Sequence, residues 1–295
     1  MGKPIYKTSQ LFSRVAIMKE RNNIVLNYLT REVKKVYSLE PISWCHDTIT
    51  QHDMAILRRE AIVGAHFDTL NLKKNLWTAV VENRATLIVK KNKFARIVIC
   101  TTNTNQTYPW DLWSRLFQWM GLPKTGIWNI YLYASDVKRI LPQVGTAVAA
   151  EHVNGGYTYP CRSDAIIIYR YEECTRVLIH ELLHAACTDT HAHAVEDKEA
   201  ATEAWAELFL VALYSKGDID TAYNLWTIQD HHIQDLNYTL KTFYNVHTPQ
   251  DYSARYTLMR EAIFSSLGIV LTEYTPKQIS SSRFTSEELD KYGLQ

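Results

Sequence analysis

Two histidines and a glutamate in the run His180-Glu181-Leu182-Leu183-His184 carry the most specific chemical signal in the sequence. If the run is helical, the histidines lie one turn apart on the same face and can reach the same metal ion. Glu181 then lies about 100° around the helix from His180, close enough to contact a water on that ion without being a ligand. Zinc lowers the pKa of such a water towards about 7, and an adjacent carboxylate can take its proton as the water attacks a carbonyl. The run therefore predicts two zinc ligands, His180 and His184, and a general base, Glu181.

The residues around this run predict a strand followed by a helix. Residues 164–171 form a short stretch rich in β-branched side chains, which is typical of a buried strand. Glu172 and Glu173 then stand where the first turn of a helix favours acidic residues. Apolar side chains occupy the arc opposite the two histidines: Leu178, Ile179, Leu182 and Ala186. We therefore expect the histidines on the polar face of a helix that follows a buried strand.

A catalytic zinc ion also needs a third protein ligand and an open fourth position. Side chains that could supply this ligand follow shortly after the histidines: Asp189, His191, His193, Glu196, Glu199, Glu203 and Glu207. The first three fall in an expected loop, whereas Glu203 and Glu207 lie one turn apart on an expected helix over residues 197–215. The four glutamates could also form a solvated stripe on this helix that has no part in the site.

The spacing resembles that of the gluzincins, a class of zinc metallopeptidases. Glu203 follows His184 after eighteen intervening residues, as the third ligand does in gluzincin aminopeptidases, and residues 202–207 are similar to the segment that carries that ligand. The resemblance implies a zinc-dependent peptide hydrolase with one Zn²⁺ per chain, bound by His180, His184 and Glu203. It also implies that Glu207 orients one of the liganding histidines, His180.

The same resemblance implies a tyrosine or histidine that stabilises the oxyanion formed during peptide hydrolysis. Tyr256 and His247 are the candidates that we single out in the C-terminal third of the chain. Either residue could instead be an ordinary core or surface side chain. The glutamate motif with which gluzincin aminopeptidases bind the substrate amino terminus is missing from the region before His180. Endopeptidase activity is therefore as consistent with the sequence as aminopeptidase activity.

A wider pattern is similar to uncharacterised metallopeptidase-like proteins of large eukaryotic DNA viruses. It is made of segments within residues 150–215, namely 154–158, 167–173, 177–181 and 202–206. This resemblance implies a viral gene product, a place in the virion and viral structural proteins as partners. It leaves two functions open, an active peptide hydrolase and a catalytically silent zincin-fold scaffold or capsid component. Glu181 favours the enzyme, because a purely structural zinc site gains nothing from a base beside an open position.

Composition and charge argue against several classes of partner. Hydrophobic residues make up 46% of the 295 residues, enough for a sizeable core, and a net charge of +1 gives no reason to expect nucleic-acid binding. Residues 1–20 contain no apolar segment typical of a signal peptide, and no stretch is apolar for long enough to span a membrane. The cysteines are odd in number and form no Cys-x-x-Cys pair, which predicts reduced thiols at Cys45, Cys100, Cys161, Cys174 and Cys187. We therefore expect a cytoplasmic or virion protein that acts on a peptide or protein substrate, without a nucleic-acid or membrane partner.

The expected elements are helical, then β-rich, then helical along the chain. Strands are expected at residues 86–90, 94–102, 127–134 and 164–171. Helices beyond the two near the motif are expected at residues 8–38, 50–75, 219–245 and 249–266, before a polar tail. This order predicts an α+β, zincin-like fold, in which a small mixed sheet packs on the motif helix and a helical C-terminal part closes the cleft. We expect a helical N-terminal region over residues 1–80 and a zincin-like metallopeptidase domain over residues 81–295, or one continuous domain over residues 1–295.

Overall fold

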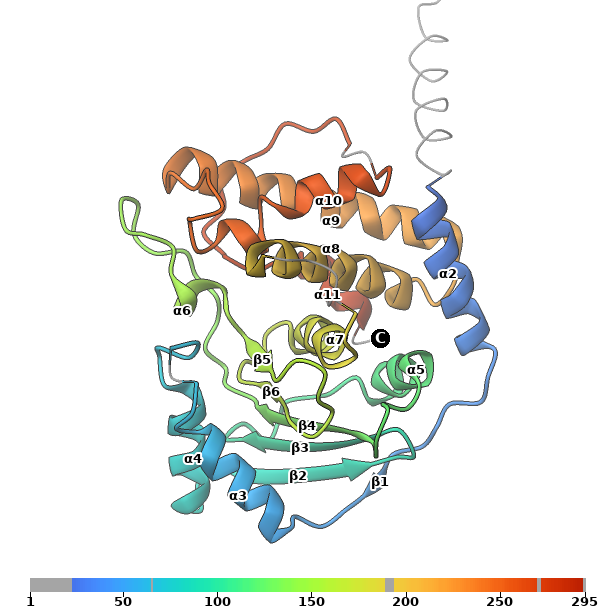
Figure 1. The fold of residues 1–295 in the computed structure, drawn as a ribbon, viewed down its shortest axis with the longest axis vertical. Coiled ribbons are helices and arrows are strands. Elements are labelled where there is room, and N and C mark those ends of the chain that lie inside the picture. The colour runs from blue at the N-terminus through green and yellow to red at the C-terminus, as the bar shows by residue number, and fades with distance from the viewer. Residues whose placement is uncertain (1–22, 65, 189–193, 270–271, 294–295) are drawn as a thin grey trace, which may run out of the picture.

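An open, mixed sheet of six strands lies between two layers of helices (Figure 1). The computed structural model describes residues 23–64, 66–188, 194–269 and 272–293. Across the sheet the strands follow the order β1-β2-β3-β4-β6-β5, with bounds β1 Cys45–His46, β2 Thr86–Lys91, β3 Ala95–Thr101, β4 Trp128–Tyr133, β5 Gly156–Thr158 and β6 Ile166–Ile168. The pairs β3–β4 and β4–β6 are parallel, and the pairs β1–β2, β2–β3 and β5–β6 are antiparallel.

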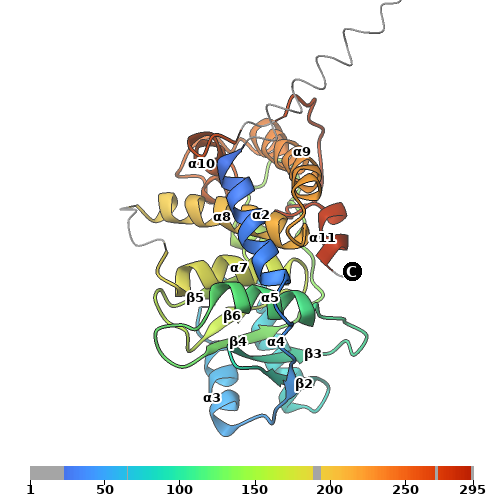
Figure 2. The ribbon, with the colours of Figure 1, turned by 90° about the vertical axis from the view of Figure 1, so that its right-hand side faces the viewer.

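Helices cover both faces of this sheet (Figures 1 and 2). On one face lie α3 (Gln51–Glu60) and α4 (Leu72–Val81), and on the other lie α5 (Trp110–Met120) and α7 (Cys174–Ala185). Beyond α7, on the side away from the sheet, is a second helical layer formed by α2 (Ile24–Tyr37), α8 (Val195–Tyr214), α9 (Ile219–Phe243), α10 (Arg260–Ser266) and α11 (Glu287–Gly293). Two short helices, α6 (Ala150–Val153) and the 3-10 helix η1 (Ala254–Tyr256), lie in the connections.

The central strands are apolar at nearly every position because both faces of the sheet are buried. In β3, Ile97 and Ile99 belong to the core that contains α5 and α7, whereas Val98 and Cys100 belong to the core beneath α3 and α4. Successive side chains along a strand point to opposite faces of the sheet and therefore enter two separate cores. This is why the strand sequences lack a polar face.

Helix α7, which carries the His-Glu-x-x-His run, lies at the centre of the molecule. All of its residues are buried, and it contacts β5 and β6 on one side and α8 on the other. The edge strand β5 approaches α7 closely enough to require glycine at position 156. A Cβ atom on Gly156 would lie 2.6 Å from Val177 Cγ1 and 2.8 Å from the carbonyl oxygen of Ile167. The motif helix is therefore held directly against the edge of the sheet.

The expected combination of a mixed sheet with helices is confirmed, while several expected segments differ in the structure. The helix expected over residues 50–75 is interrupted between α3 and α4. Residues 249–266 form only η1 and α10 instead of one long helix. Residues 1–80 are not wholly helical, because they supply β1, and residues 8–22 lie outside the described part of the chain.

The largest difference concerns the polar segment that follows α10. It is packed into the protein rather than forming a tail, and Ser282, Phe284 and Thr285 are each at most 2% exposed. The Ser282 hydroxyl donates to the carbonyl oxygen of His152 and the Thr285 amide donates to the buried Glu173 carboxylate, pairings that cannot be seen in a local sequence pattern. Among the described helices, none is both long and apolar enough to cross a membrane.

Cys161 and Cys187 form a disulfide, with 4.7 Å between their Cα atoms. The expectation of reduced thiols is therefore wrong for this pair, and it no longer supports a reducing compartment. The remaining cysteines are free: Cys45, Cys100 and Cys174. The backbone N–H groups of Cys161 and Cys187 both donate to the carbonyl oxygen of His184 at 3.1 Å. The disulfide thus joins the loop between β5 and β6 to the end of the motif helix.

We expect the denatured, unreduced protein to expose three thiols out of its five cysteines. Tryptic mapping should recover a cross-linked peptide pair that contains Cys161 and Cys187. Because the bond closes a loop of 26 residues, its reduction should lower the free energy of unfolding by about 2–4 kcal/mol. A Cys45→Ser variant is the control and should keep the cross-link. Five reactive thiols before reduction would contradict the assignment.

Candidate metal centre

The two motif histidines direct the same ring nitrogen towards a common point. Their Nε2 atoms lie 3.0 Å apart, as positions i and i+4 of a regular helix allow. Both residues are nearly buried, with 7% of His180 and 8% of His184 exposed. Burial on a helix that is packed on both sides holds the rings in place and limits the access of bulk water.

A third donor, Glu199 in the second turn of α8, completes the cluster. Its Oε2 atom lies 3.4 Å from His180 Nε2 and 3.6 Å from His184 Nε2. These two histidines and this glutamate are the group of His, Cys, Asp and Glu residues in the described chain whose ligand atoms converge closely enough to hold one metal ion.

The geometry of this cluster fits a single zinc ion. Zinc binds imidazole nitrogen and carboxylate oxygen at about 2.0–2.2 Å, so two ligands of a tetrahedral ion lie roughly 3.3–3.5 Å apart. The distances between the three donor atoms are 3.0, 3.4 and 3.6 Å, which bracket that value. Two neutral imidazoles and one carboxylate are also a donor set that zinc uses in catalytic sites, where the fourth position stays open.

Glu203, the expected third ligand, lies on the opposite side of the His180 ring. Its Oε1 atom is 3.3 Å from His180 Nδ1, and its Oε2 atom is bonded to the Arg176 guanidinium. The Glu203 carboxylate is within ion-pair distance of His180 Nδ1 but is not aligned for a hydrogen bond. His180 Nδ1 has no hydrogen-bond partner among the described residues. The expectation for Glu203 is therefore corrected: Glu199, one turn earlier, faces the Nε2 atoms.

Glu207 lies one helical turn further along α8 than the glutamate that faces His180 Nδ1. It was expected to orient His180, but its carboxylate accepts hydrogen bonds from Arg260 Nη1 at 2.8 Å and from the side-chain amide of Gln229. The residue is fully buried and contacts neither histidine. Glu203 is instead the glutamate that lies beside His180 Nδ1. Both differences have one cause, because the packing of α8 on α7, rather than sequence spacing, decides which turn of α8 meets the histidines.

The remaining candidates for the third ligand lie elsewhere. Glu196 is paired with Arg255, whose Nη2 atom is 3.3 Å from Glu196 Oε1. Asp189, His191 and His193 fall outside the described residues.

Glu181 lies beside the cluster without belonging to it. Its carboxylate is buried, and a Cβ atom on Gly156 would come within 3.3 Å of Glu181 Oε1, so strand β5 passes close to it. Burial is the main cause that raises the pKa of Glu181 from 4.5 to about 7, while His180 and His184 oppose that shift. A carboxyl group with a pKa near 7 can both accept and return a proton at neutral pH, as a general base requires.

A cavity of about 320 Å³ opens onto these groups. It is lined by residues from α7, α8, β5, η1 and the C-terminal segment, including Phe67, Tyr157, Glu181, Glu199, Tyr256 and Phe284. A second cavity, of about 440 Å³, lies near the start of α7 between Glu172 and Asp290 and contains none of the expected site residues. The smaller cavity is therefore the one that brings a substrate-sized space to the candidate ligands.

The two expected oxyanion donors have different positions. Tyr256 lines the cavity, and burial, reinforced by the nearby Glu199 carboxylate, raises the pKa of its hydroxyl well above the ordinary range. The hydroxyl therefore stays protonated and can donate a hydrogen bond. His247 is exposed in the turn before η1, where its backbone N–H donates to Asp251, and it does not line the cavity. The expectation for His247 is thus wrong, because the chain turns away from the cavity at this point.

The structure adds residues that sequence reasoning passed over. Glu199 was one of several acidic candidates. Its spacing of four residues from Glu203, and of eight from Glu207, places the three on one helical face, which was the available signal that Glu199 could also face the histidines. Arg176, a charged residue one turn before His180 on an otherwise apolar helix, was a second signal. No sequence feature pointed to Phe284.

Comparisons with protein-family models, with curated proteins and with solved structures find no significant match to this chain.

We expect Glu199→Gln to lose stoichiometric zinc, because it removes the carboxylate that faces both Nε2 atoms. Glu203→Gln should retain one zinc per chain but bind it about 10–100-fold more weakly, as is usual when a group that orients a ligand is lost. Elemental analysis after dialysis and competition with a chelator measure the two effects. Full zinc in Glu199→Gln, together with its loss from Glu203→Gln, would restore the arrangement expected from the sequence.

In metal-free protein we expect Glu181→Gln to be more stable than the wild type at pH 8 and equally stable near pH 4.5. The pKa of Glu181 is raised from 4.5 to about 7, so the folded chain keeps a proton that the unfolded chain releases. The resulting stabilisation is present below pH 4.5 and is lost as the pH rises through 7. Denaturation in a chelator across this range should show a difference on the order of 3 kcal/mol. The exposed Glu40→Gln variant is the control, and parallel pH profiles for wild type and Glu181→Gln would refute the expectation.

Proposed function

We propose that the protein is a zinc-dependent peptide hydrolase that binds its ion through His180, His184 and Glu199. The observation that carries this proposal is the convergence of these three donor atoms at spacings that suit a tetrahedral ion. The ion, when bound, would act as a Lewis acid that polarises the scissile carbonyl and lowers the pKa of a water molecule. The proposal replaces the gluzincin spacing by one in which fourteen residues separate His184 from the third ligand.

Glu181 is the proposed general base. It is buried next to the cluster, it lines the cavity, and it is not one of the converging ligand atoms. In this position its carboxylate accepts a proton from the attacking water and returns it to the leaving amine. Tyr256 lines the same cavity as a neutral hydroxyl and is the proposed donor to the oxyanion.

The arrangement of elements also supports a zincin-like interpretation of the fold. The motif helix packs against a mixed sheet, and the short antiparallel strand β5 forms the edge of that sheet beside the motif. An edge strand has unpaired backbone groups, which suit an extended peptide as substrate. A peptide or protein is therefore the proposed substrate.

We expect Glu181→Gln to keep its zinc and its fold but to cleave peptides at least about 10²-fold more slowly, the scale of general-base catalysis. A library of unstructured peptides, analysed by mass spectrometry, supplies a substrate for the comparison, and Glu40→Gln serves as an inert control. Wild-type activity in Glu181→Gln would remove this residue from the mechanism. A wild-type chain that binds one zinc and cleaves nothing would favour a catalytically silent scaffold.

A further inference from the structure

The C-terminal segment places one aromatic ring, that of Phe284, in the lining of the cavity beside the metal centre. Phe284 is 2% exposed, and three guanidinium groups surround its ring. The distances from guanidinium carbon to ring centroid are 4.7 Å for Arg176, 5.4 Å for Arg139 and 5.7 Å for Arg260. Cations over an aromatic face are attracted by the ring electrons, most strongly where water is excluded. The ring therefore restricts where these arginines can lie.

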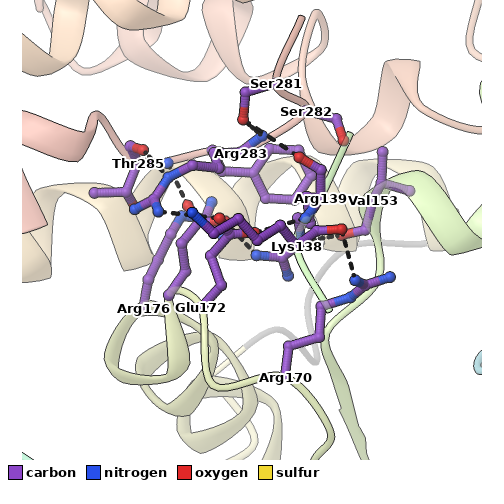
Figure 3. Close-up of polar contacts among 12 residues, drawn as sticks. Lys138, Arg139, Val153, Arg170, Glu172, Arg176, Ser281, Ser282, Arg283 and Thr285 are labelled. Atoms are coloured by element: carbon purple, nitrogen blue, oxygen red, sulfur yellow. Dashed lines mark hydrogen bonds and ion pairs between the residues drawn. The ribbon is translucent and has the colours of Figure 1, made fainter. Parts of the chain in front are cut away.

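Backbone hydrogen bonds fix this segment to the second helical layer. The carbonyl of Phe284 accepts a bond of 2.7 Å from Gln229 Nε2, and Gln229 Oε1 accepts a bond of 3.0 Å from the Ser286 amide. The Thr285 amide donates to Glu173, just before α7. Figure 3 shows this segment, with Ser281, Arg283 and Thr285, crossing close to Arg176. Phe284 is thus held at a defined place between α7 and α9.

Arg176 links this ring to the metal centre. It lies one turn before His180 on α7, is 1% exposed, and bonds to Glu203 through one terminal nitrogen. Its Nε atom has no hydrogen-bond partner among the described groups. Arg260 likewise leaves its Nε and Nη2 atoms without a hydrogen-bond partner in the described part of the chain, so it is the contact with Glu203, and not the unsatisfied donor, that distinguishes Arg176. The other oxygen of Glu203 faces His180 Nδ1 at 3.3 Å.

We propose that Arg176 and Phe284 are positioning residues for the zinc centre, acting on His180 through Glu203. This inference rests on the zinc site proposed above. Arg176 fixes one carboxylate oxygen of Glu203, and the other oxygen is then directed at Nδ1. That contact favours the tautomer with the proton on Nδ1, which leaves the lone pair of Nε2 free for the ion. Phe284 packs against the guanidinium of Arg176, so a residue one hundred positions after His184 influences the first histidine of the motif.

The pair Arg260–Glu207 provides an internal comparison. It is also a fully buried arginine–glutamate pair, it lies one turn further along α8, and Arg260 faces the same ring. Glu207 contacts no histidine of the motif. Any effect that comes only from breaking a buried ion pair should therefore appear equally at Arg176 and Arg260.

The test compares Arg176→Lys with Arg260→Lys in the full-length protein. Lysine keeps the charge but loses the planar fork of donors. Zinc dissociation constants come from competition with a chelator, the visible spectrum of the cobalt-substituted protein reports ligand geometry, and thermal unfolding of the metal-free protein reports stability. We expect both variants to lower the melting temperature. Only Arg176→Lys should weaken zinc binding, by about 10–100-fold, and alter the cobalt spectrum.

Two further variants address the route of the effect. Phe284→Leu keeps all charges and should weaken zinc binding in the same direction as Arg176→Lys. If Arg176 acts through Glu203, the double variant Arg176→Lys/Glu203→Gln should bind zinc no more weakly than Glu203→Gln alone. Additive losses would mean that Arg176 does not act through Glu203.

The outcomes separate this inference from the proposed function. If the wild type binds zinc and both Arg176→Lys and Phe284→Leu bind it as tightly as the wild type does, the inference is overturned but the proposed zinc site stands. Equal weakening by Arg176→Lys and Arg260→Lys would do the same, because it would indicate a general loss of packing. A wild-type chain that takes up no zinc would overturn the proposed zinc site, and the inference would fall with it.

Discussion

The burial of α7 between the sheet and a second layer of helices is the constraint on which the rest of the structure depends. A helix buried on all sides is normally apolar, yet α7 carries Arg176, His180, Glu181 and His184 within three turns. Each charge placed there has lost its water and needs a partner from a neighbouring element. The surrounding helices and the C-terminal segment are therefore organised around these polar groups as much as around the apolar core.

Buried arginine–glutamate pairs around α7 meet part of this requirement. Arg176 pairs with Glu203, Arg260 with Glu207 and Arg139 with Glu173, and nearly all of these side chains are inaccessible to water. Burial acts to raise the pKa of Glu173, but Arg139, Arg283 and Arg176 overcome it and lower the value to about 2. Such pairs add little net stability, because desolvation offsets much of their attraction, but a mispaired alternative is costly. The pair Arg176–Glu203 joins α7 to α8 directly and favours one alignment of the two helices, in which Glu199 faces the histidines.

Glu181, which lines the cavity, differs from Glu173. Burial raises the pKa of Glu181 to about 7, while His180 and His184 oppose the shift. Glu173, which has three arginines around it, and Glu181, which has the two histidines, thus have pKa values shifted in opposite directions although both carboxyl groups are buried. The Cys161–Cys187 disulfide and the close approach of β5 at Gly156 hold the cavity side in place without adding charge.

The sequence by itself determined the elements with strong local signals. These were the hairpin of β2 and β3, the strands β4 and β6, the motif helix, α8 and α9, and with them the pairing of His180 and His184, since helical geometry alone sets their separation. Tertiary structure decided which turn of α8 faces the histidines. Glu199 lies at the Nε2 atoms, where the spacing suggested Glu203, and Glu203 lies beside His180 Nδ1, where the spacing suggested Glu207. It also decided that Cys161 meets Cys187, that His247 turns away from the cavity, and that Phe284 enters the core. These features depend on contacts between segments distant in the chain, whose energies come from burial and charge pairing and leave no periodic pattern in the sequence.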